Sequence, residues 1–370
     1  MNLSYWEYKT WLSNIDFTIV GSGIVGLNCA LALKKRYPQA KILVLEKGIL
    51  PQGASTKNAG FACFGSISEI ISDLRAGTQQ EVVDLVQRRW KGIQLLRKNL
   101  GDSAIDFQQY GGHELFLDKH EELYLSCLDS LNEVNLLLQP IFGKEAFRTH
   151  SNTFRFKRIQ ENYITNSFEA QLDTGRMMMA LLSKVQERGV LLLNSVTLQG
   201  FSEQENSVSV TTSEFDFCTQ KLFIATNGFT SQVLNEEVTP ARAQVLITSP
   251  IPNLQIKGTF HFDEGYYFFR NIDNRILFGG GRNLDIKGEQ TSKFGHTKQI
   301  QDRLEELLGT TILPKTKFVI ERRWSGIMGL GPKKKPIVKQ VSQNVYCGVR
   351  MGGMGIAIGS LIGQDLADLI

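Results

Sequence analysis

Apolar runs and helical periodicity alternate at the start of the chain. Residues 15–20 and 41–46 are short apolar runs of the kind that forms buried strands. Between them, residues 24–37 repeat apolar side chains at helical spacing, and Pro38 ends that repeat. The beginning of the chain therefore predicts a β-α-β unit.

Strand-like alternation dominates the middle of the chain. Further helices are predicted at residues 79–100, 119–139, 174–188 and 291–308, and after the glycine-rich stretch 348–359. Strands are predicted at residues 106–108, 114–117, 191–193, 196–202, 207–212, 221–225, 241–248, 259–262, 266–270, 276–280 and 316–324. Residues 53–68, rich in Gly, Ala, Ser and Asn, predict a loop. This order predicts an α+β fold in which a Rossmann-type domain is interleaved with a β-rich domain.

Composition agrees with an ordinary globular protein of two or three structural units. Of the 370 residues, 42% are hydrophobic and 21% are charged, and the net charge of +4 gives little support to a nucleic-acid partner. No apolar run reaches the roughly 20 residues that cross a bilayer. The N-terminus lacks the features of a secretory signal, and the five scattered cysteines fit a reducing, cytoplasmic compartment. Neither CxxC nor HExxH spacing occurs, so no metal site is expected.

The strongest motif is a glycine fingerprint at the first strand-to-helix turn. Residues Gly21-Ser22-Gly23-Ile24-Val25-Gly26 read GxGxxG, and Glu46 ends the next strand twenty residues after Gly26. Gly21 suits the tight turn, Gly23 lets the backbone approach a pyrophosphate, and Gly26 lets helix and strand pack closely. Glu46 can accept hydrogen bonds from ribose hydroxyls. This context predicts a dinucleotide site, and FAD and NAD both remain open at this point.

Other segments resemble the D-amino-acid oxidase superfamily, which includes glycine oxidase, sarcosine oxidase and γ-glutamylputrescine oxidase. The resemblance is carried, in chain order, by Glu46-Lys47-Gly48 with residues 53–60, by Ala225-Thr226-Asn227-Gly228, by Pro240-Ala241-Arg242-Ala243-Gln244, by residues 266–270 and 275–280, and by Trp324-Ser325-Gly326 with residues 352–356. The early Ser4-Tyr5-Trp6 favours the γ-glutamylputrescine oxidase-like branch. The resemblance implies bound FAD.

The FAD contacts that the fingerprint and the resemblance together imply extend from the first strand to the last helix. They are Gly21, Ser22, Gly23, Val25, Gly26, Glu46, Lys47, Ala54, Ser55, Asn58, Ala59, Gly60, Val196, Thr226, Asn227, Gly228, Gly326, Arg350, Gly352, Gly353, Met354, Gly355 and Ile356. An FAD-binding domain is expected from residues 1–68, 164–234 and 320–370, and a substrate domain from residues 69–163 and 235–319.

The chain departs from the family pattern at several positions. Met328 stands where glycine oxidase carries an arginine for the substrate carboxylate, and Leu277 where sarcosine oxidases carry a lysine that helps oxygen react. Arg350 opens a stretch that usually reads G-H-G-x-x-G in the family. Sarcosine oxidases attach flavin through a cysteine that residues 321–332 lack, so FAD is expected to be bound non-covalently.

Three residues are candidates for catalysis or substrate binding. Arg270, at a strand end, could hold a carboxylate with its planar guanidinium, unless it is a surface arginine. Tyr267 faces either the flavin or the core. Arg350 stabilises charge on the reduced flavin, holds an acid group, or forms a salt bridge. Cys63 and His113 are more typical of packing residues than of redox or basic groups.

The predicted activity is oxidation of the C–N bond of an amine or amino acid. A hydride passes to flavin N5, and the resulting imine is hydrolysed. The predicted partners are a small amine or amino-acid substrate and oxygen or another electron acceptor. Two alternatives remain: a dehydrogenase that reduces a quinone or carrier protein, and a tRNA-modifying flavoprotein of the same superfamily. A non-enzymatic nucleotide-binding role is a further alternative.

Overall fold

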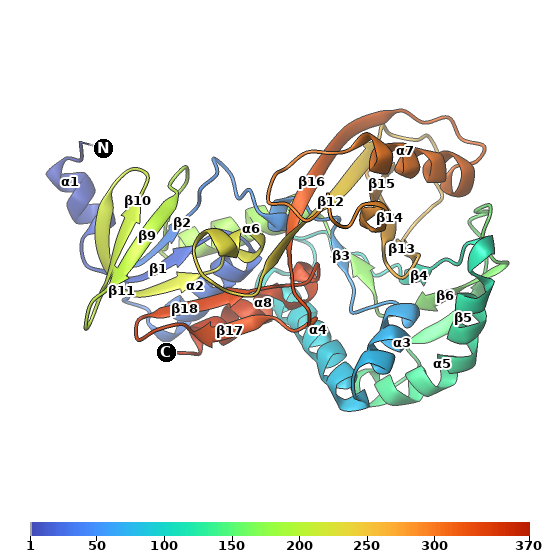
Figure 1. Cartoon of the computed structure of the whole chain (residues 1–370), viewed down its shortest axis with the longest axis horizontal. Helices are drawn as coiled ribbons and strands as arrows, with labels where there is room; N and C mark the ends of the chain where they lie inside the picture. Colours follow the sequence, from blue (N-terminus) through green and yellow to red (C-terminus); the bar gives the residue numbers. More distant parts are fainter. Residues whose placement is uncertain (1) are drawn as a thin grey trace.

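Two large sheets organise the computed structural model, which describes residues 2–370 (Figure 1). The first sheet lies in the left half of Figure 1, and its parallel centre joins strands from both ends of the chain. Its order is β17 (Ile337–Gln340), β18 (Val345–Val349), β11 (Asp216–Ile224), β1 (Ile15–Val20), β2 (Ile42–Leu45) and β8 (Leu191–Leu193), with β10 (Val208–Thr212) and β9 (Leu198–Glu203) branching from β11.

Three helices cover one face of the first sheet. Helix α2 (Ile24–Arg36) follows β1 and packs against α8 (Gly355–Ala367) and α6 (Thr174–Glu187). Close approach of α2 and α8 requires glycine, because a Cβ on Gly363 would lie 2.6 Å from the carbonyl oxygen of Val25. Helices α2 and α8, which are far apart in sequence, therefore pack side by side in one layer over the first sheet.

The second sheet lies to the right in Figure 1 and has an aromatic core. Its order is β16 (Ile320–Leu330), β12 (Thr239–Thr248), β15 (Arg275–Gly280), β14 (Tyr267–Ile272), β13 (Thr259–Phe262), β4 (Gly112–Glu114), β6 (Asn162–Asn166) and β5 (Phe147–Ser151). Phe260 and Phe269 stack with ring centroids 4.5 Å apart. The surrounding helices are α3 (Ile67–Ala76), α4 (Gln79–Leu100), α5 (Glu121–Phe142) and α7 (Lys298–Leu307).

Short elements connect the two sheets and complete the chain. A two-stranded ribbon, β3 (Phe61–Ala62) with β7 (Ala170–Gln171), joins segments that are far apart in sequence. The remaining elements are α1 (Tyr5–Glu7), two π-helical turns, η1 (Tyr8–Leu12) and η6 (Leu308–Ile312), and four 3₁₀ turns, η2 (Ala54–Thr56), η3 (Asp118–His120), η4 (Asn227–Gln232) and η5 (Arg282–Leu284).

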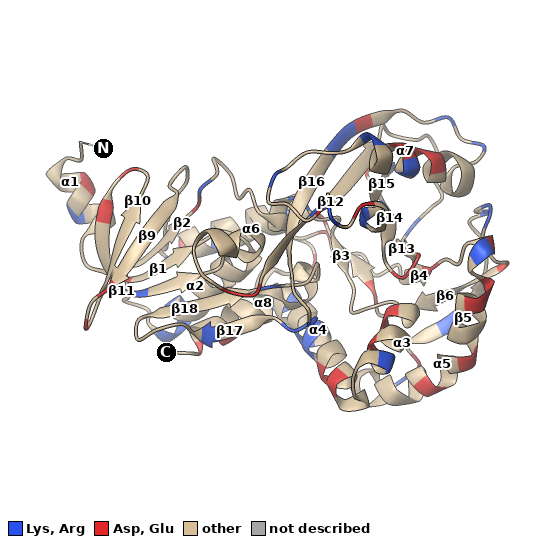
Figure 2. Cartoon of the chain, viewed as in Figure 1, with Lys and Arg blue, Asp and Glu red and all other residues tan. Residues whose placement is uncertain are grey.

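The surface charge is mixed. Figure 2 shows that both signs occur along α4 and α7, whereas the charged residues of α5 are all acidic. Among residues 2–370, every helix is too short or too polar to cross a bilayer.

The mixed α/β architecture with Rossmann-type and β-rich parts is confirmed, but some predicted boundaries are wrong. Residues 320–330, expected in the FAD-binding domain, pair with β12 along the strand and so belong to the second sheet. Residues 162–166 also extend that sheet. Residues 106–108 form only a single bridge, from Gln108 to Gln171. The helix predicted from residue 291 begins at Lys298.

Helix α3 begins inside the predicted loop 53–68. Its capping box explains this start: the Ser66 side chain accepts from the backbone of Glu69, whose carboxylate accepts in return from the Ser66 backbone.

Candidate active site

A cavity of about 630 Å³ is lined by residues from both sheets. One end of it meets the carboxyl ends of β1, β2 and β11, which are parallel neighbours in the first sheet. The other end lies under β13, β14 and β15 of the second sheet. In open parallel sheets, ligands bind beyond the carboxyl ends of the strands, so the first end is the expected nucleotide site.

The turn after β1 is shaped for a backbone that approaches a ligand. Gly21 has φ of +106°, and a Cβ there would lie 2.8 Å from the carbonyl oxygen of Ala225. A Cβ on Gly26 would lie 2.0 Å from the carbonyl oxygen of Gly21, so this glycine lets α2 start against β1 and does not line the cavity. The N-terminus of α2 therefore faces the cavity, and the partial positive charge of a helix N-terminus suits phosphate groups.

Glu46 is held in place by backbone and hydroxyl donors. Its Oε2 accepts from the Ser22 hydroxyl at 2.8 Å and from the Ser22 amide at 3.2 Å, while Oε1 accepts from the Gly48 amide at 3.0 Å. Ser22 is fully buried and does not line the cavity. Glu46 and Val196 do line it. Ser22 therefore positions Glu46 from behind the cavity wall, and a direct contact of Ser22 with the cofactor stays a prediction.

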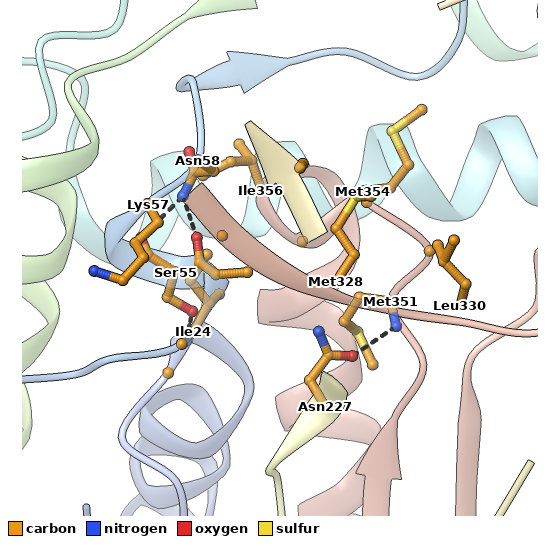
Figure 3. A pocket seen from close by; sticks show the side chains of 18 of the residues that line it. Ile24, Ser55, Lys57, Asn58, Asn227, Met328, Leu330, Met351, Met354 and Ile356 are labelled. Carbon is orange, nitrogen blue, oxygen red and sulfur yellow. Dashed lines mark hydrogen bonds between the residues drawn. The ribbon is translucent and has the colours of Figure 1, made fainter. Parts of the chain in front are cut away.

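The loop after η2 is fixed by one asparagine. Asn58 donates through Nδ2 to the carbonyl oxygens of Ala54 and Ser55, and its Oδ1 accepts from the Gly60 amide and the Thr174 hydroxyl. The Ser55 hydroxyl accepts from the Ile24 amide at 2.9 Å. Figure 3 shows Ser55, Lys57 and Asn58 beside the start of α2. The loop therefore forms a rigid wall of the cavity.

A second turn forms the opposite wall, at the start of α8. Asn227 has φ of +44°, and its Oδ1 accepts from the Met351 amide at 3.1 Å (Figure 3). Gly352 and Gly353 have φ of +61° and +83°, so the chain turns sharply before the helix. Met354 and Met328 lie beside this turn in Figure 3 and line the cavity.

Most of the predicted cofactor residues line the cavity. They are Gly21, Gly23, Val25, Glu46, Lys47, Ala54, Ser55, Asn58, Ala59, Val196, Thr226, Asn227, Gly326, Gly352, Gly353, Met354, Gly355 and Ile356. The exceptions are Ser22, Gly26, Gly60, Gly228 and Arg350, which pack behind its wall. Gly228, for instance, approaches β16, where a Cβ would lie 2.7 Å from the carbonyl oxygen of Met328.

Comparison with known proteins decides the family. Residues 16–369 match the model of the DAO family, FAD dependent oxidoreductase. The chain belongs to this family. It is also 20% identical over 382 residues, which cover 98% of this chain and 84% of the relative, to the probable oxidoreductase OrdL of Haemophilus influenzae.

Solved structures show the same fold at low sequence identity. Glycine oxidase from Geobacillus kaustophilus has a TM-score of 0.75 and 18% identity, over 96% of this chain and 94% of that one. L-proline dehydrogenase from P. horikoshii has a TM-score of 0.74 and 17% identity, over 96% and 93%. L-amino acid deaminase from Proteus vulgaris, crystallised without its specific insertion sequence, has a TM-score of 0.73 and 16% identity, over 97% and 90%.

DAO-family proteins bind FAD, and the cavity suits this cofactor. The glycine turn before α2 admits a pyrophosphate, and Glu46 offers carboxylate oxygens for a ribose. The remainder of the cavity, toward the second sheet, is left for the flavin ring and a substrate.

Arg270 does not line this DAO-family cavity. It is only 3% exposed, and its Nη1 donates to the carbonyl oxygens of Leu172 at 2.6 Å and Gly60 at 3.1 Å. Its Nε donates to the carbonyl of Asn271. Burial lowers the pKa of Arg270 to about 10, although nearby aspartates oppose this effect. Contrary to the sequence-based expectation, Arg270 connects β14 to the loop after η2 through these hydrogen bonds and has no access to a substrate.

Tyr267 and Arg350 also point away from the cavity. Tyr267 stacks on Phe262 with ring centroids 5.0 Å apart, inside the core of the second sheet, while its neighbours Tyr266 and Phe268 line the cavity. Arg350 donates to the carbonyl oxygens of Lys335 and Glu237, at 3.0 and 3.2 Å. Neither residue is placed to touch the flavin or a substrate.

His113 is a packing residue, as its sequence context favours. Its Nδ1 lies 2.9 Å from the Thr165 hydroxyl, and its ring lies 4.8 Å from that of Phe260. Burial lowers the pKa of His113 to about 4, with further lowering by His150 and His261. The imidazole is therefore neutral at physiological pH and lies behind the cavity wall.

The buried arginine that does line the cavity is Arg89, on α4. It is 4% exposed, and its Nη1 donates to the carbonyl oxygen of Phe64 at 2.8 Å. Its Nε has no hydrogen-bond partner, and no carboxylate within residues 2–370 forms a salt bridge with it. The pattern of α4 could have revealed it, because Arg89 falls in the apolar stripe that contains Val82, Val86 and Ile93.

His261 is a second cavity residue that sequence reasoning missed. Its ring meets that of Phe61 edge to face at 5.1 Å, and its Nε2 lies 3.5 Å from Oε2 of Glu169. Burial lowers the pKa of His261, but Glu169 more than offsets this, and the net pKa is raised above the usual value. The cavity therefore combines a buried guanidinium with a histidine whose pKa is raised by a neighbouring carboxylate.

Proposed function

We propose that the protein oxidises the C–N bond of an amine or amino acid in this cavity. Bound FAD supplies the hydride acceptor, and water hydrolyses the imine product. The observation that carries the proposal is one continuous cavity, with the dinucleotide cradle at one end and aromatic and charged side chains at the other. The DAO-family neighbours named glycine oxidase, L-proline dehydrogenase and L-amino acid deaminase support an amino-acid substrate.

Aromatic side chains in the cavity wall would position the substrate. Phe61, Tyr266 and Phe268 line the cavity, and Phe61 meets Phe268 edge to face at 5.7 Å. These rings exclude water and limit how a donor C–H can lie against the flavin. If the amine arrives neutral, its lone pair drives the step and no dedicated base is required. The cavity therefore needs to orient the substrate more than to deprotonate it.

We further propose that Arg89 holds an acid group of the substrate. A buried guanidinium without a counter-ion is unfavourable, and a carboxylate that enters the cavity supplies the missing charge and acceptor. Its planar donors suit two carboxylate oxygens at once. Arg282, which also lines the cavity, lies near its rim above the Tyr266 ring. Because it is buried far more deeply, Arg89 is the better anchor.

Anaerobic reduction of the flavin tests the proposed function. The holoenzyme is mixed with D- and L-amino acids, N-methyl amines and polyamine conjugates, each acid paired with its amide. We expect the flavin absorbance to bleach with at least one amine, and faster with the acid of each pair. Bleaching by alcohols or hydroxy acids but by none of the amines would reject C–N oxidation.

A dehydrogenase that reduces a quinone or carrier protein is the second candidate. The observation that favours it is Leu277, which stands where sarcosine oxidases carry an oxygen-activating lysine by resemblance and is buried in β15 beside Ile247. Reoxidation of the bleached enzyme separates the two acceptors. Rapid return of flavin absorbance in air indicates an oxidase, whereas return only with a quinone indicates a dehydrogenase.

A further inference from the structure

Three potential metal ligands meet in the wall of the cavity, although they come from distant parts of the chain. Cys63, Glu169 and His261 each offer one ligand atom, and these atoms lie within 4.8 Å of one another. The β3–β7 ribbon explains the first pair, because Ala62 pairs with Ala170 and the next residues along the antiparallel ribbon are Cys63 and Glu169. Strand β13 brings His261 to the same place.

The fold makes room for the carboxylate at this position. Glu169 is 1% exposed, and a Cβ on Gly112 would lie only 1.7 Å from its Oε2. Gly112 lies on β4, the parallel neighbour of the strand that carries His261. A side chain on Gly112 would therefore displace Glu169 from the cluster.

Two of the ligand atoms have unused bonding capacity. Glu169 Oε1 and His261 Nε2 are buried without a hydrogen-bond partner. The contact between these two side chains is an ion pair of 3.5 Å, which is long for a hydrogen bond. Buried polar atoms are normally satisfied, so two orphans that face the same cysteine indicate a missing group.

We propose that Cys63, Glu169 and His261 bind a divalent metal ion of the Zn²⁺ class. A thiolate, an imidazole and a carboxylate are ligands that Zn²⁺ accepts, whereas Mg²⁺ and Ca²⁺ prefer oxygen ligands. On binding, the thiol proton of Cys63 passes to solvent, and so does the Nε2 proton of His261 where that imidazole is charged. Bonds of about 2.0–2.3 Å place tetrahedral ligands roughly 3.5 Å apart, so the ligand atoms need to approach by no more than about 1.3 Å.

The fourth coordination position opens into the cavity, because Cys63 and His261 both line it. Three protein ligands with one open position are typical of zinc sites that bind water or a substrate group. Cys63 Sγ also lies 3.9 Å from Met354 Sδ, in the turn before α8. The ion would therefore lie beside the turn that leads into α8. The proposed oxidation does not require this ion, and Zn²⁺ binding can be measured without substrate turnover.

Metal titration of the FAD-loaded protein tests the site. After treatment with a chelator and its removal, we expect calorimetry to give one Zn²⁺ per chain, with excess Mg²⁺ present throughout. Co²⁺ in place of Zn²⁺ should add a thiolate charge-transfer band and ligand-field bands, seen as a difference from the metal-free holoenzyme. Glu169→Gln should weaken Zn²⁺ binding at least tenfold, and Cys63→Ser should remove the thiolate band.

A matched control is available in Cys218, an exposed free cysteine on β11 outside the cavity. Cys218→Ser should keep both the Zn²⁺ stoichiometry and the cobalt spectrum. Full FAD content and an unchanged circular dichroism spectrum would show that each variant is folded, and Glu169→Gln provides the test if Cys63→Ser does not fold. Absence of stoichiometric Zn²⁺ binding, or binding that Cys63→Ser and Glu169→Gln leave unchanged, would overturn the proposal.

Discussion

The two ends of the cavity are built in different ways. At the dinucleotide end, backbone turns and helix N-termini form much of the wall, and many of its residues come from one stretch of sequence, residues 20–60. At the substrate end, side chains from α4, the β3–β7 ribbon and the second sheet converge from distant positions. A backbone site tolerates little change in its glycines, whereas a side-chain site can change ligand by substituting single residues.

Two buried arginines, one lining the substrate end and one behind it, differ in their hydrogen-bond partners. Arg270 donates to three carbonyl oxygens, while Arg89 donates to one and leaves Nε without a partner. Neither guanidinium has a carboxylate partner among residues 2–370. The donors of Arg270 are therefore paired within the protein, whereas Arg89 keeps an unpartnered Nε for the acid group that we propose it binds.

The largest effect is expected from Gly21→Val, at the dinucleotide end. The new side chain would meet the Ala225 carbonyl and would require a φ that valine rarely adopts. We expect purified protein without FAD, measured as the ratio of flavin to protein absorbance. Gly200→Val is the control, because a Cβ at Gly200 meets open space. Full FAD content in Gly21→Val would contradict the placement of the phosphates.

Arg89→Met should have the next largest effect, confined to acidic substrates. Loss of the guanidinium leaves the substrate acid group unpaired in the cavity, at a cost of roughly 2–5 kcal/mol in kcat/KM. The corresponding amides should lose far less. Arg88→Met is the matched control, since Arg88 is the next residue on α4 but pairs with Asp365 at the surface. Equal losses for acids and amides would reject Arg89 as the anchor.

Arg270→Met should act on stability instead. Three carbonyl oxygens lose their charged donor, so we expect the free energy of unfolding to fall by roughly 2–4 kcal/mol, measured by urea denaturation. The kcat/KM values of the folded variant should change equally for acids and amides. A loss specific to acids would show that Arg270 reaches the substrate after all.

Glu46→Gln should give the smallest effect. The Glu46 carboxylate accepts hydrogen bonds from Ser22 and Gly48. A glutamine side chain has an NH₂ group in place of one oxygen, so one of these two hydrogen bonds would be lost. Weaker ribose binding should cost roughly 1–2 kcal/mol, on the order of tenfold in the Kd for FAD by apoprotein titration. Glu187→Gln, at the exposed end of α6, is expected to leave the Kd unchanged.

The dinucleotide end could be predicted from the sequence because its determinants are local. The glycine turn at Gly21, the helix after it and Glu46 all belong to one β-α-β unit. Residues that are close in the sequence are therefore also close in space. The strand order of the first sheet could not be predicted in the same way. It depends on β11 and β18, which come from much later in the chain.

The substrate end was harder to predict, for separate physical reasons. Residues 266–269 are all aromatic, so alternation could not show that Tyr266 and Phe268, and not Tyr267, face the cavity. Arg350 has φ of +67°, a left-handed turn that directs its side chain to Glu237.

The metal-ligand cluster left no local signal at all. Cys63, Glu169 and His261 are each about a hundred residues apart, while metal motifs are recognised by short spacings. Only the pairing of β3 with β7, and the position of β13, bring these residues together.

The position of β18 and α8 in the sequence also affects how the protein folds. Strand β18 joins the parallel centre of the first sheet, and the turn before α8 forms one wall of the cavity, yet both follow the other strands of this sheet in the sequence. Pairings of such large sequence separation form late. Until β18 pairs with β11, the first sheet thus has an open edge that is prone to aggregation. The cavity wall formed by residues 351–356 is consequently completed late in folding, and we expect free FAD to raise the yield of refolded protein.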